Sequence, residues 1–141
     1  MIWQPPKSPF NLIQERLWEN PWRLLIACIF CNQTKRVKAE PVLWKFFEKY
    51  PTAHEAAKAQ TDQLIPMLSP LGLQKRRATT LIRFSKEFLE KEWKAPSELY
   101  GIGKYATDAW KIFCLGDWQS VTPKDHALSD YHSFLRETSD A

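Results

Sequence analysis

Cysteine is scarce in this chain of 141 residues, and long apolar runs are missing from it. Its three cysteines cannot form a fully paired disulfide framework, which favours a reducing compartment. The longest apolar run, residues 24–31, is far shorter than the ~20 residues that cross a bilayer. The first residues show no charged leader before an apolar core, so they do not resemble a signal peptide. These absences predict a soluble protein with no membrane partner.

The spacing of cysteine and histidine gives little support to redox or metal chemistry. Cys28 and Cys31 fall on one face of an apolar helical run, without the βαβ context of a redox motif, so buried core thiols are expected. His126 and His132 would lie on different faces of a helix. The sequence therefore predicts no metal site.

Strand patterns are absent as well, and helical patterns take their place. No stretch alternates with period two for long enough to predict a strand, whereas apolar residues recur at helical spacing along most of the chain. Residues 24–30 are apolar on all sides and predict a central buried helix. With 44% hydrophobic residues, the chain is long enough to bury a single core, so residues 1–141 are expected to form one all-α domain.

Proline behind a residue of the capping type marks several expected helix starts. Thr52 and Glu55 add a capping box before another helix. If Thr122 caps the last helix, Asp125 takes its third helical position, where the helix N-terminus favours a negative charge. A carboxylate there either only caps the helix or, facing a cleft, stabilises a cationic transition state or takes a proton from water. The proline sites are Ser8–Pro9, Asn20–Pro21, Glu40–Pro41 and Thr122–Pro123.

Two glycines flank Ile102 between two helical runs. This turn is either an ordinary helix cap or a place where Gly101 and Gly103 leave main-chain N–H groups open to a phosphate, beside the charge of Lys104. No strand precedes it, so a dinucleotide-binding fold is not expected. The net charge of +4 and the basic residues beside several turns fit a DNA backbone. The turn therefore predicts a helix-hairpin-helix motif. The basic residues concerned are Lys35, Arg36, Lys38, Lys75, Arg76, Arg77, Lys104 and Lys124.

The hairpin at residues 99–103 and the later pair Asp125–His126 together resemble the signature of the helix-hairpin-helix DNA glycosylase superfamily. Five segments are similar to the glycosylase domain of the methyl-CpG-binding-domain thymine glycosylase family. They are "PPKSPFNLIQERLWENPWRLLIACIFCNQT", "PVLWKFFEKYPTA", "PLGLQKRRATTLIRFSKEFL", "YGIGKYATDAWKIF" and "PKDHALSDYHSFL". This similarity covers nearly the whole chain. It implies a two-lobed all-α bundle with a helix-hairpin-helix motif and a DNA-binding cleft.

By this resemblance, Asp125 is the catalytic residue of a DNA glycosylase. The implied reaction hydrolyses the N-glycosidic bond of thymine or uracil mispaired with guanine and leaves an abasic site for base excision repair. Members such as endonuclease III carry a lysine nucleophile two positions after the second hairpin glycine. Tyr105 occupies that position here, which implies a monofunctional enzyme with Tyr105 lining the base pocket.

The resemblance also assigns the residues that extrude the base. Gln33 fills the vacated space in the duplex, Leu73 is an apolar wedge between base steps, and Gln14 holds the flipped pyrimidine. Without the resemblance, Leu73 would be an ordinary core leucine, and periodicity alone would place Gln14 at the surface. Gly101, Gly103 and Lys104 would bind the backbone phosphate. Gln33 stands where vertebrate members have arginine, and Ala127 stands where a basic contact is expected in animal relatives.

No iron–sulfur cluster is expected, because no cysteine follows Cys114; the hairpin carbonyls could hold a monovalent cation. The expected partner is double-stranded DNA with a G·T or G·U mismatch, the expected location is the nucleus, and a monomer is expected. Two alternatives stay open: a non-catalytic helix-hairpin-helix DNA-binding module, and a glycosylase-lyase that acts on oxidised pyrimidines.

Overall fold

A computed structural model describes residues 3–32 and 34–139 of the chain. Within these ranges every regular element is helical, which confirms the all-α class. The α-helices are α1 (Gln14–Leu17), α2 (Pro21–Cys31), α3 (Arg36–Lys49), α4 (Ala53–Ala57), α5 (Thr61–Leu68), α6 (Gln74–Glu90), α7 (Lys104–Ala109) and α8 (His126–Ser139). Two 3₁₀ turns, Ser69–Leu71 and Pro96–Glu98, and a π-helical segment, Trp110–Leu115, lie between them.

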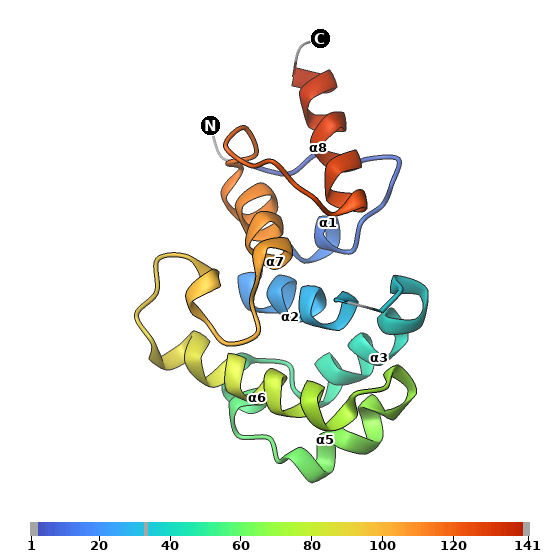
Figure 1. The fold of residues 1–141 in the computed structure, drawn as a ribbon, viewed down its shortest axis with the longest axis vertical. Helices are drawn as coiled ribbons and strands as arrows, with labels where there is room; N and C mark the ends of the chain where they lie inside the picture. The colour runs from blue at the N-terminus through green and yellow to red at the C-terminus, as the bar shows by residue number, and fades with distance from the viewer. Residues whose placement is uncertain (1–2, 33, 140–141) are drawn as a thin grey trace.

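Helix α2 separates two groups of helices. In Figure 1, α3, α5 and α6 lie below it, and α1, α7 and α8 lie above it. Asn20 begins the helix by accepting a hydrogen bond from the Arg23 amide at 3.2 Å, and Pro21 takes the first position, as predicted. Residues 24–30 are all buried, because α2 contacts α1, α3, α6 and α7. The predicted central helix and the two lobes are therefore both present.

Aromatic packing joins α2 to the lower lobe. The apolar residues of α3, namely Val42, Leu43, Phe46 and Phe47, are buried, and the Phe30 and Phe46 rings lie 5.5 Å apart between their centroids. The Trp22 ring lies 5.8 Å from that of Phe47, and its indole N–H donates to Ser85 Oγ on α6 at 3.0 Å. Each fully buried ring of this kind contributes roughly 1.5–3 kcal/mol by leaving water.

Three of the predicted helix starts are wrong. Pro41 lies inside α3, and Glu40 does not cap a helix because its carboxylate binds arginine side chains instead. No helix follows Pro9, since Ser8 binds the Glu15 carboxylate through its amide and its hydroxyl. The last helix begins at His126, three residues later than Thr122–Pro123 predicts.

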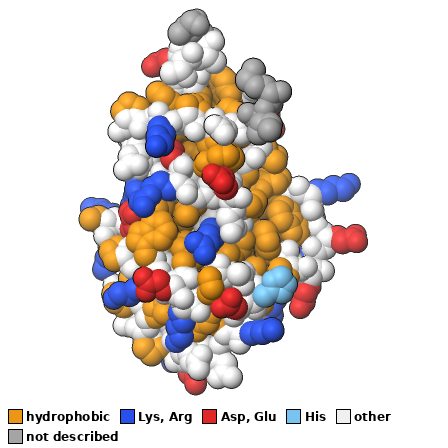
Figure 2. All heavy atoms as spheres, turned by 180° about the vertical axis from the view of Figure 1, so that it is seen from behind, with side chains coloured by type: hydrophobic (Ala, Val, Ile, Leu, Met, Phe, Trp, Pro, Cys, Tyr) orange, Lys and Arg blue, Asp and Glu red, His pale blue; other side chains and the backbone are white. Residues whose placement is uncertain are grey.

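Hydrophobic side chains also reach the surface. On the face behind the view of Figure 1, they gather over the middle of the molecule, with acidic and basic side chains scattered among them (Figure 2). In the described part of the chain, no helix has the length and apolar character that crossing a membrane requires.

Candidate active site

The Gly-Ile-Gly turn joins Pro96–Glu98 to α7, as the sequence predicts. Gly101 has a φ of 82°, and a Cβ atom there would lie 2.6 Å from Thr80 Cγ2 on α6. Only glycine fits that position without displacing Thr80. Gly103 is extended, and apart from its two chain neighbours no atom of the described residues lies within 4 Å of the point where its Cβ would be. Another backbone can therefore approach the turn closely at Gly103.

Asp125 is the cap of α8 rather than its third residue. Its Oδ2 accepts a hydrogen bond from the Leu128 amide at 3.0 Å, and its carbonyl accepts one from the Ser129 amide at 2.9 Å. This pattern is that of an N-cap aspartate, in which one carboxylate oxygen satisfies a first-turn amide. Oδ1 receives no hydrogen bond from the described residues, so it can face a ligand.

A cavity of about 270 Å³ brings three of the predicted site residues together. Gln14, Tyr105 and Asp125 all line it, although they come from α1, α7 and the start of α8. Its remaining walls come mainly from the end of α2 and the start of α3. They are Leu12, Ile13, Cys31, Asn32, Thr34, Arg36 and Ala127.

Gln14 and Tyr105 are bonded to each other inside this cavity. Gln14 Nε2 donates to Tyr105 Oη at 2.8 Å and to Cys28 Sγ at 3.6 Å, and only 3% of the residue is exposed. Helical periodicity predicts a surface position for Gln14, which is wrong. Burial raises the pKa of the Tyr105 phenol far above its usual range, so the hydroxyl stays protonated and can donate a hydrogen bond to a ligand.

The two neighbouring cysteines are both free thiols, as predicted, but only Cys28 is fully enclosed. Burial raises the pKa of Cys28 to about 12 and that of Cys31 to about 11. Cys31 lines the cavity as an uncharged, weakly polar group. The prediction of core thiols therefore holds for Cys28 and is incomplete for Cys31.

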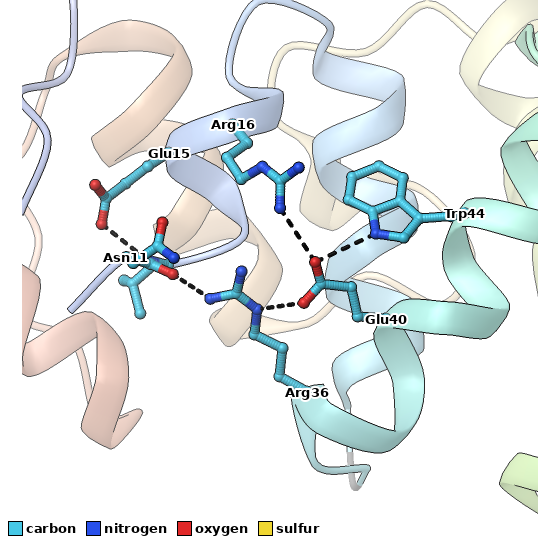
Figure 3. A network of polar contacts seen from close by, with 7 residues as sticks. Asn11, Glu15, Arg16, Arg36, Glu40 and Trp44 are labelled. Atoms are coloured by element: carbon cyan, nitrogen blue, oxygen red, sulfur yellow. Dashed lines mark hydrogen bonds and ion pairs between the residues drawn. The ribbon is translucent and has the colours of Figure 1, made fainter.

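A network of side chains holds Arg36 at the cavity wall (Figure 3). Arg36 Nε donates to Glu40 Oε2 at 2.8 Å, and its Nη1 donates to the Asn11 carbonyl. The other carboxylate oxygen, Oε1, binds Arg16 Nη1 at 3.2 Å and Trp44 Nε1 at 3.2 Å. Burial alone would raise the pKa of Glu40, but the hydrogen bond and charge of Arg36 outweigh it, so the pKa lies below its usual value.

Lys104 has two partners within the protein. Its Nζ donates to Asp108 Oδ2 at 2.6 Å and to the Thr122 carbonyl at 3.0 Å. Asp108 therefore compensates much of the charge that the sequence offers to a phosphate. The phosphate-binding role of Lys104 stays a prediction.

Leu73 protrudes from the protein surface. It caps α6 in the left-handed conformation, with a φ of 50°, and 55% of the residue is exposed. A leucine in this conformation is unfavourable by roughly 1 kcal/mol, so the surrounding loop must hold it there. Such a position fits an inserting wedge better than a core leucine. Gln33, the predicted plug, lies outside the described residues.

Arg77 ties the Leu73 loop to the end of α2. It donates to the Gly72 carbonyl at 3.0 Å, to the Phe30 carbonyl at 3.4 Å and to Thr34 Oγ1 at 2.5 Å. One guanidinium group therefore connects the turn before Leu73 to Phe30 in α2 and to Thr34.

Two smaller hollows extend the cavity along the protein surface. One of about 160 Å³ is lined by both hairpin glycines and shares Asn32 and Tyr105 with the main cavity. The other, of about 180 Å³, contains Leu73 and again shares Asn32. The three hollows are neighbours, because all three share Asn32 in their walls, and together they are called the groove. Among the described residues, no cluster of three metal-binding side chains accompanies it.

The comparison with known proteins defines the class. Residues 26–133 match the HhH-GPD superfamily of base excision DNA repair proteins, so the chain belongs to this superfamily of helix-hairpin-helix DNA glycosylases.

Two individual proteins are similar to this chain in sequence. The chain is 40% identical over 134 residues to the methyl-CpG-binding domain protein 4-like protein of Arabidopsis thaliana, which is 95% of this chain and 30% of that protein. It is 27% identical over 94 residues to a thymine/uracil-DNA glycosylase of Pyrobaculum aerophilum, with 62% of this chain and 41% of that protein covered. The chain thus spans less than half of the length of these two relatives.

A solved structure shares the fold. The structure of a thermostable thymine-DNA glycosylase matches with a TM-score of 0.63 and 24% identity, over 70% of this chain and 50% of that one. This confirms the superfamily fold that the sequence predicts.

Proposed function

We propose that this chain is the catalytic part of a monofunctional DNA glycosylase that removes thymine or uracil mispaired with guanine. The enzyme would extrude the base from double-stranded DNA, hydrolyse its N-glycosidic bond and leave an abasic site for base excision repair. The observation that carries the proposal is the cavity in which Asp125, Tyr105 and Gln14 meet. We further propose that it acts in the nucleus as a monomer and without a cofactor.

The chemistry assigned to Asp125 follows from its position. As the bond between C1′ and the base nitrogen breaks, its electron pair leaves with the base and the sugar becomes cationic. A carboxylate already oriented by the Leu128 amide stabilises that charge without reorganising. Oδ1 accepts a proton from the attacking water, whose oxygen bonds to C1′. The departing base anion takes a proton from solvent water, and Asp125 returns its proton to solvent, so the net reaction adds one water across the bond.

The other groups of the groove would hold the substrate. The Gln14 side chain and the protonated Tyr105 hydroxyl offer hydrogen bonds to the carbonyl and N–H groups of a pyrimidine. Leu73 would fill the opened base step, together with Gln33. The amides of Gly101 and Gly103 would bind a backbone phosphate. Lys104 would lie next to that phosphate, but its ammonium group is already bound to Asp108 and to the Thr122 carbonyl, so the amides would make the contact.

The proposal is tested with duplexes that carry a G·T mismatch, a G·U mismatch, an A·T pair or an oxidised pyrimidine. After incubation and alkali, strand breaks are expected at the two mismatches and not at A·T. Intact strands with retained duplex binding would instead favour a non-catalytic DNA-binding module. Breaks that form at oxidised pyrimidines before alkali is added would favour a glycosylase-lyase.

Substitution of Asp125 tests its role directly, and Asp130 supplies the matched control. Asp125→Asn should bind the mismatched duplex as the wild type does and lose at least about 100-fold in single-turnover rate, the size of effect seen when one electrostatic group is removed from an active site. Asp130→Asn changes the same residue type on α8, where the carboxylate lies 3.5 Å from His126 Nε2 and does not line the cavity. Its rate should be unchanged.

A further inference from the structure

The chain just before Asp125, residues 121–125, is irregular, and few side chains of the described residues form hydrogen bonds to it. Residues 117–125 contain no helix. Pro123 and Asp125 accept hydrogen bonds from α8 itself, through Ser129 Oγ at 3.1 Å and the Leu128 amide at 3.0 Å. Among the described residues, Lys104 is the only side chain from another helix that hydrogen-bonds to residues 121–125.

The nearly buried carboxylate of Asp108 holds Lys104 in its hydrogen bond to the Thr122 carbonyl. Lys104 Nζ reaches the Thr122 carbonyl at 3.0 Å while it binds Asp108 Oδ2 at 2.6 Å. The Asp108 side chain is only 10% exposed, whereas that of Lys104 is 47% exposed. Removing the lysine would leave a poorly solvated carboxylate without compensation, so the ammonium group is held where it is.

We propose that the ion pair of Lys104 and Asp108 positions Asp125 by fixing the Thr122 carbonyl three residues ahead of it. Lys104 is then a positioning residue for the glycosylase reaction, an inference that rests on the function proposed above. It links the hairpin that grips the DNA backbone to the carboxylate that acts on the sugar. A displacement of about 1 Å at such a carboxylate can lower a rate by about 100-fold.

This role differs from a direct phosphate contact in measurable ways. A lysine that binds a phosphate supports affinity, and its loss lowers the slope of log affinity against log salt concentration by roughly one unit. A lysine that positions Asp125 supports the chemical step instead. The two roles also predict different results for Asp108→Asn, which keeps the charge of Lys104 and removes the carboxylate that holds it. A phosphate-binding lysine would then raise DNA affinity, whereas a positioning lysine would lose its place and the excision rate would fall.

The experiment measures single-turnover excision, duplex affinity at several salt concentrations, and amide hydrogen exchange for four variants. Lys104→Met and Asp108→Asn should each lose about 10- to 100-fold in excision rate, with affinity within about twofold of the wild type and an unchanged salt slope. Lys104→Arg keeps the charge and the donors, so it should recover most of the rate. Lys111→Met, on the π-helical segment that continues α7, is the matched control and should behave as the wild type.

Hydrogen exchange reports on the hydrogen bond between Lys104 and the Thr122 carbonyl without any catalysis. The Leu128 and Ser129 amides, which bind Asp125, should exchange faster in Lys104→Met than in the wild type. Unchanged exchange and rate would overturn the inference, and so would weaker binding with a lower salt slope at an unchanged rate. A wild-type protein without excision activity would overturn the proposed function, while the exchange measurement would still decide whether Lys104 holds the Asp125 segment.

Discussion

Gln14 Nε2 donates a hydrogen bond to Tyr105 Oη at 2.8 Å, although 91 residues separate the two along the chain. The bond connects α1 to α7 across one wall of the cavity and leaves the Tyr105 proton free for a ligand. Gln14 also bonds to Cys28 on α2, so three helices fix the orientation of one amide. With both N–H groups of Gln14 used, its carbonyl oxygen and the Tyr105 hydroxyl proton are the fixed groups that can select a ligand by its pattern of N–H and carbonyl groups.

Tyr105→Phe should lower excision without unfolding the protein. The change removes an acceptor from the buried Gln14 amide, which costs about 1–3 kcal/mol, and removes the hydroxyl that would contact the base. We expect a loss of about tenfold or more in kcat/KM and a small decrease in melting temperature. The measurement is steady-state excision from a G·T duplex beside a thermal melt.

Gln14→Glu is the companion change at the same bond. It keeps the shape of the side chain but replaces the amide donor with a carboxylate inside the cavity. Excision should fall further than in Tyr105→Phe, because two carboxylates would then line one cavity. Full activity in both variants would contradict a role for this pair in holding the base.

Leu73→Ala should weaken base extrusion. The exposed, left-handed leucine has no core to lose, so stability should change by less than about 0.5 kcal/mol, as is typical of surface positions. The loss of an inserted apolar side chain should lower kcat/KM by about tenfold on duplex DNA. Excision from single-stranded substrate, which needs no wedge, should change much less.

Leu115 supplies the control for this prediction. It is 51% exposed, close to the 55% of Leu73, and it does not line the groove. Leu115→Ala should leave excision from both substrates unchanged. Equal losses in the two variants would mean that apolar surface, rather than the wedge position, carries the effect.

The sequence predicts the parts of this site that depend on local chemistry. The hairpin follows from its glycines and the buried α2 from its apolar run, because both are decided within a few residues. Leu73, by contrast, looks like an ordinary core leucine until the left-handed turn at Gly72–Leu73 is seen.

What the sequence misses depends on contacts between distant helices. Gln14 reads as a surface residue, since only the packing of α1 on α2 and α7 buries it. Thr122–Pro123 looks like a helix start, but the Thr122 carbonyl is taken by Lys104 and the helix begins at His126. Local rules identify Thr122 and Asp125 as residues that can cap a helix. They do not predict which of the two caps α8.

Alkaline pH should destabilise the protein through its buried thiols and phenol. Burial raises the pKa of Cys28 to about 12 and that of Cys31 to about 11, and raises that of Tyr105 as well. In the unfolded chain these groups ionise near 8.5 for cysteine and about 10 for tyrosine. The unfolded state therefore loses protons first, and the free energy of unfolding falls as pH rises from about 8.5 towards 11.

Denaturant unfolding at pH 7, 8.5 and 10 measures this effect. Stability should fall only slightly between the first two values and clearly between the second and the third. Cys31→Ala should reduce the decrease, because one of the shifted groups is gone. A stability that stays constant to pH 10 would contradict the burial of these groups.

Arg36 and Arg16 offer the sharpest comparison on the cavity wall. Both bind Glu40, at 2.8 Å and 3.2 Å, but only Arg36 lines the cavity that contains Asp125. Arg36→Gln and Arg16→Gln should therefore change stability by similar small amounts, about 1 kcal/mol or less each, because exposed ion pairs contribute little. Their effects on DNA should differ.

Arg36→Gln removes a cation from the wall of the proposed base pocket. Affinity for the mismatched duplex should fall, and the slope of log affinity against log salt should decrease by roughly one unit, whereas Arg16→Gln should keep both values. Fluorescence anisotropy between 50 and 200 mM salt would resolve the slopes, a range over which such contacts change affinity strongly. If the two variants lose affinity equally, the Glu40 network supports the fold alone, and the wall of the cavity does not contact the DNA backbone.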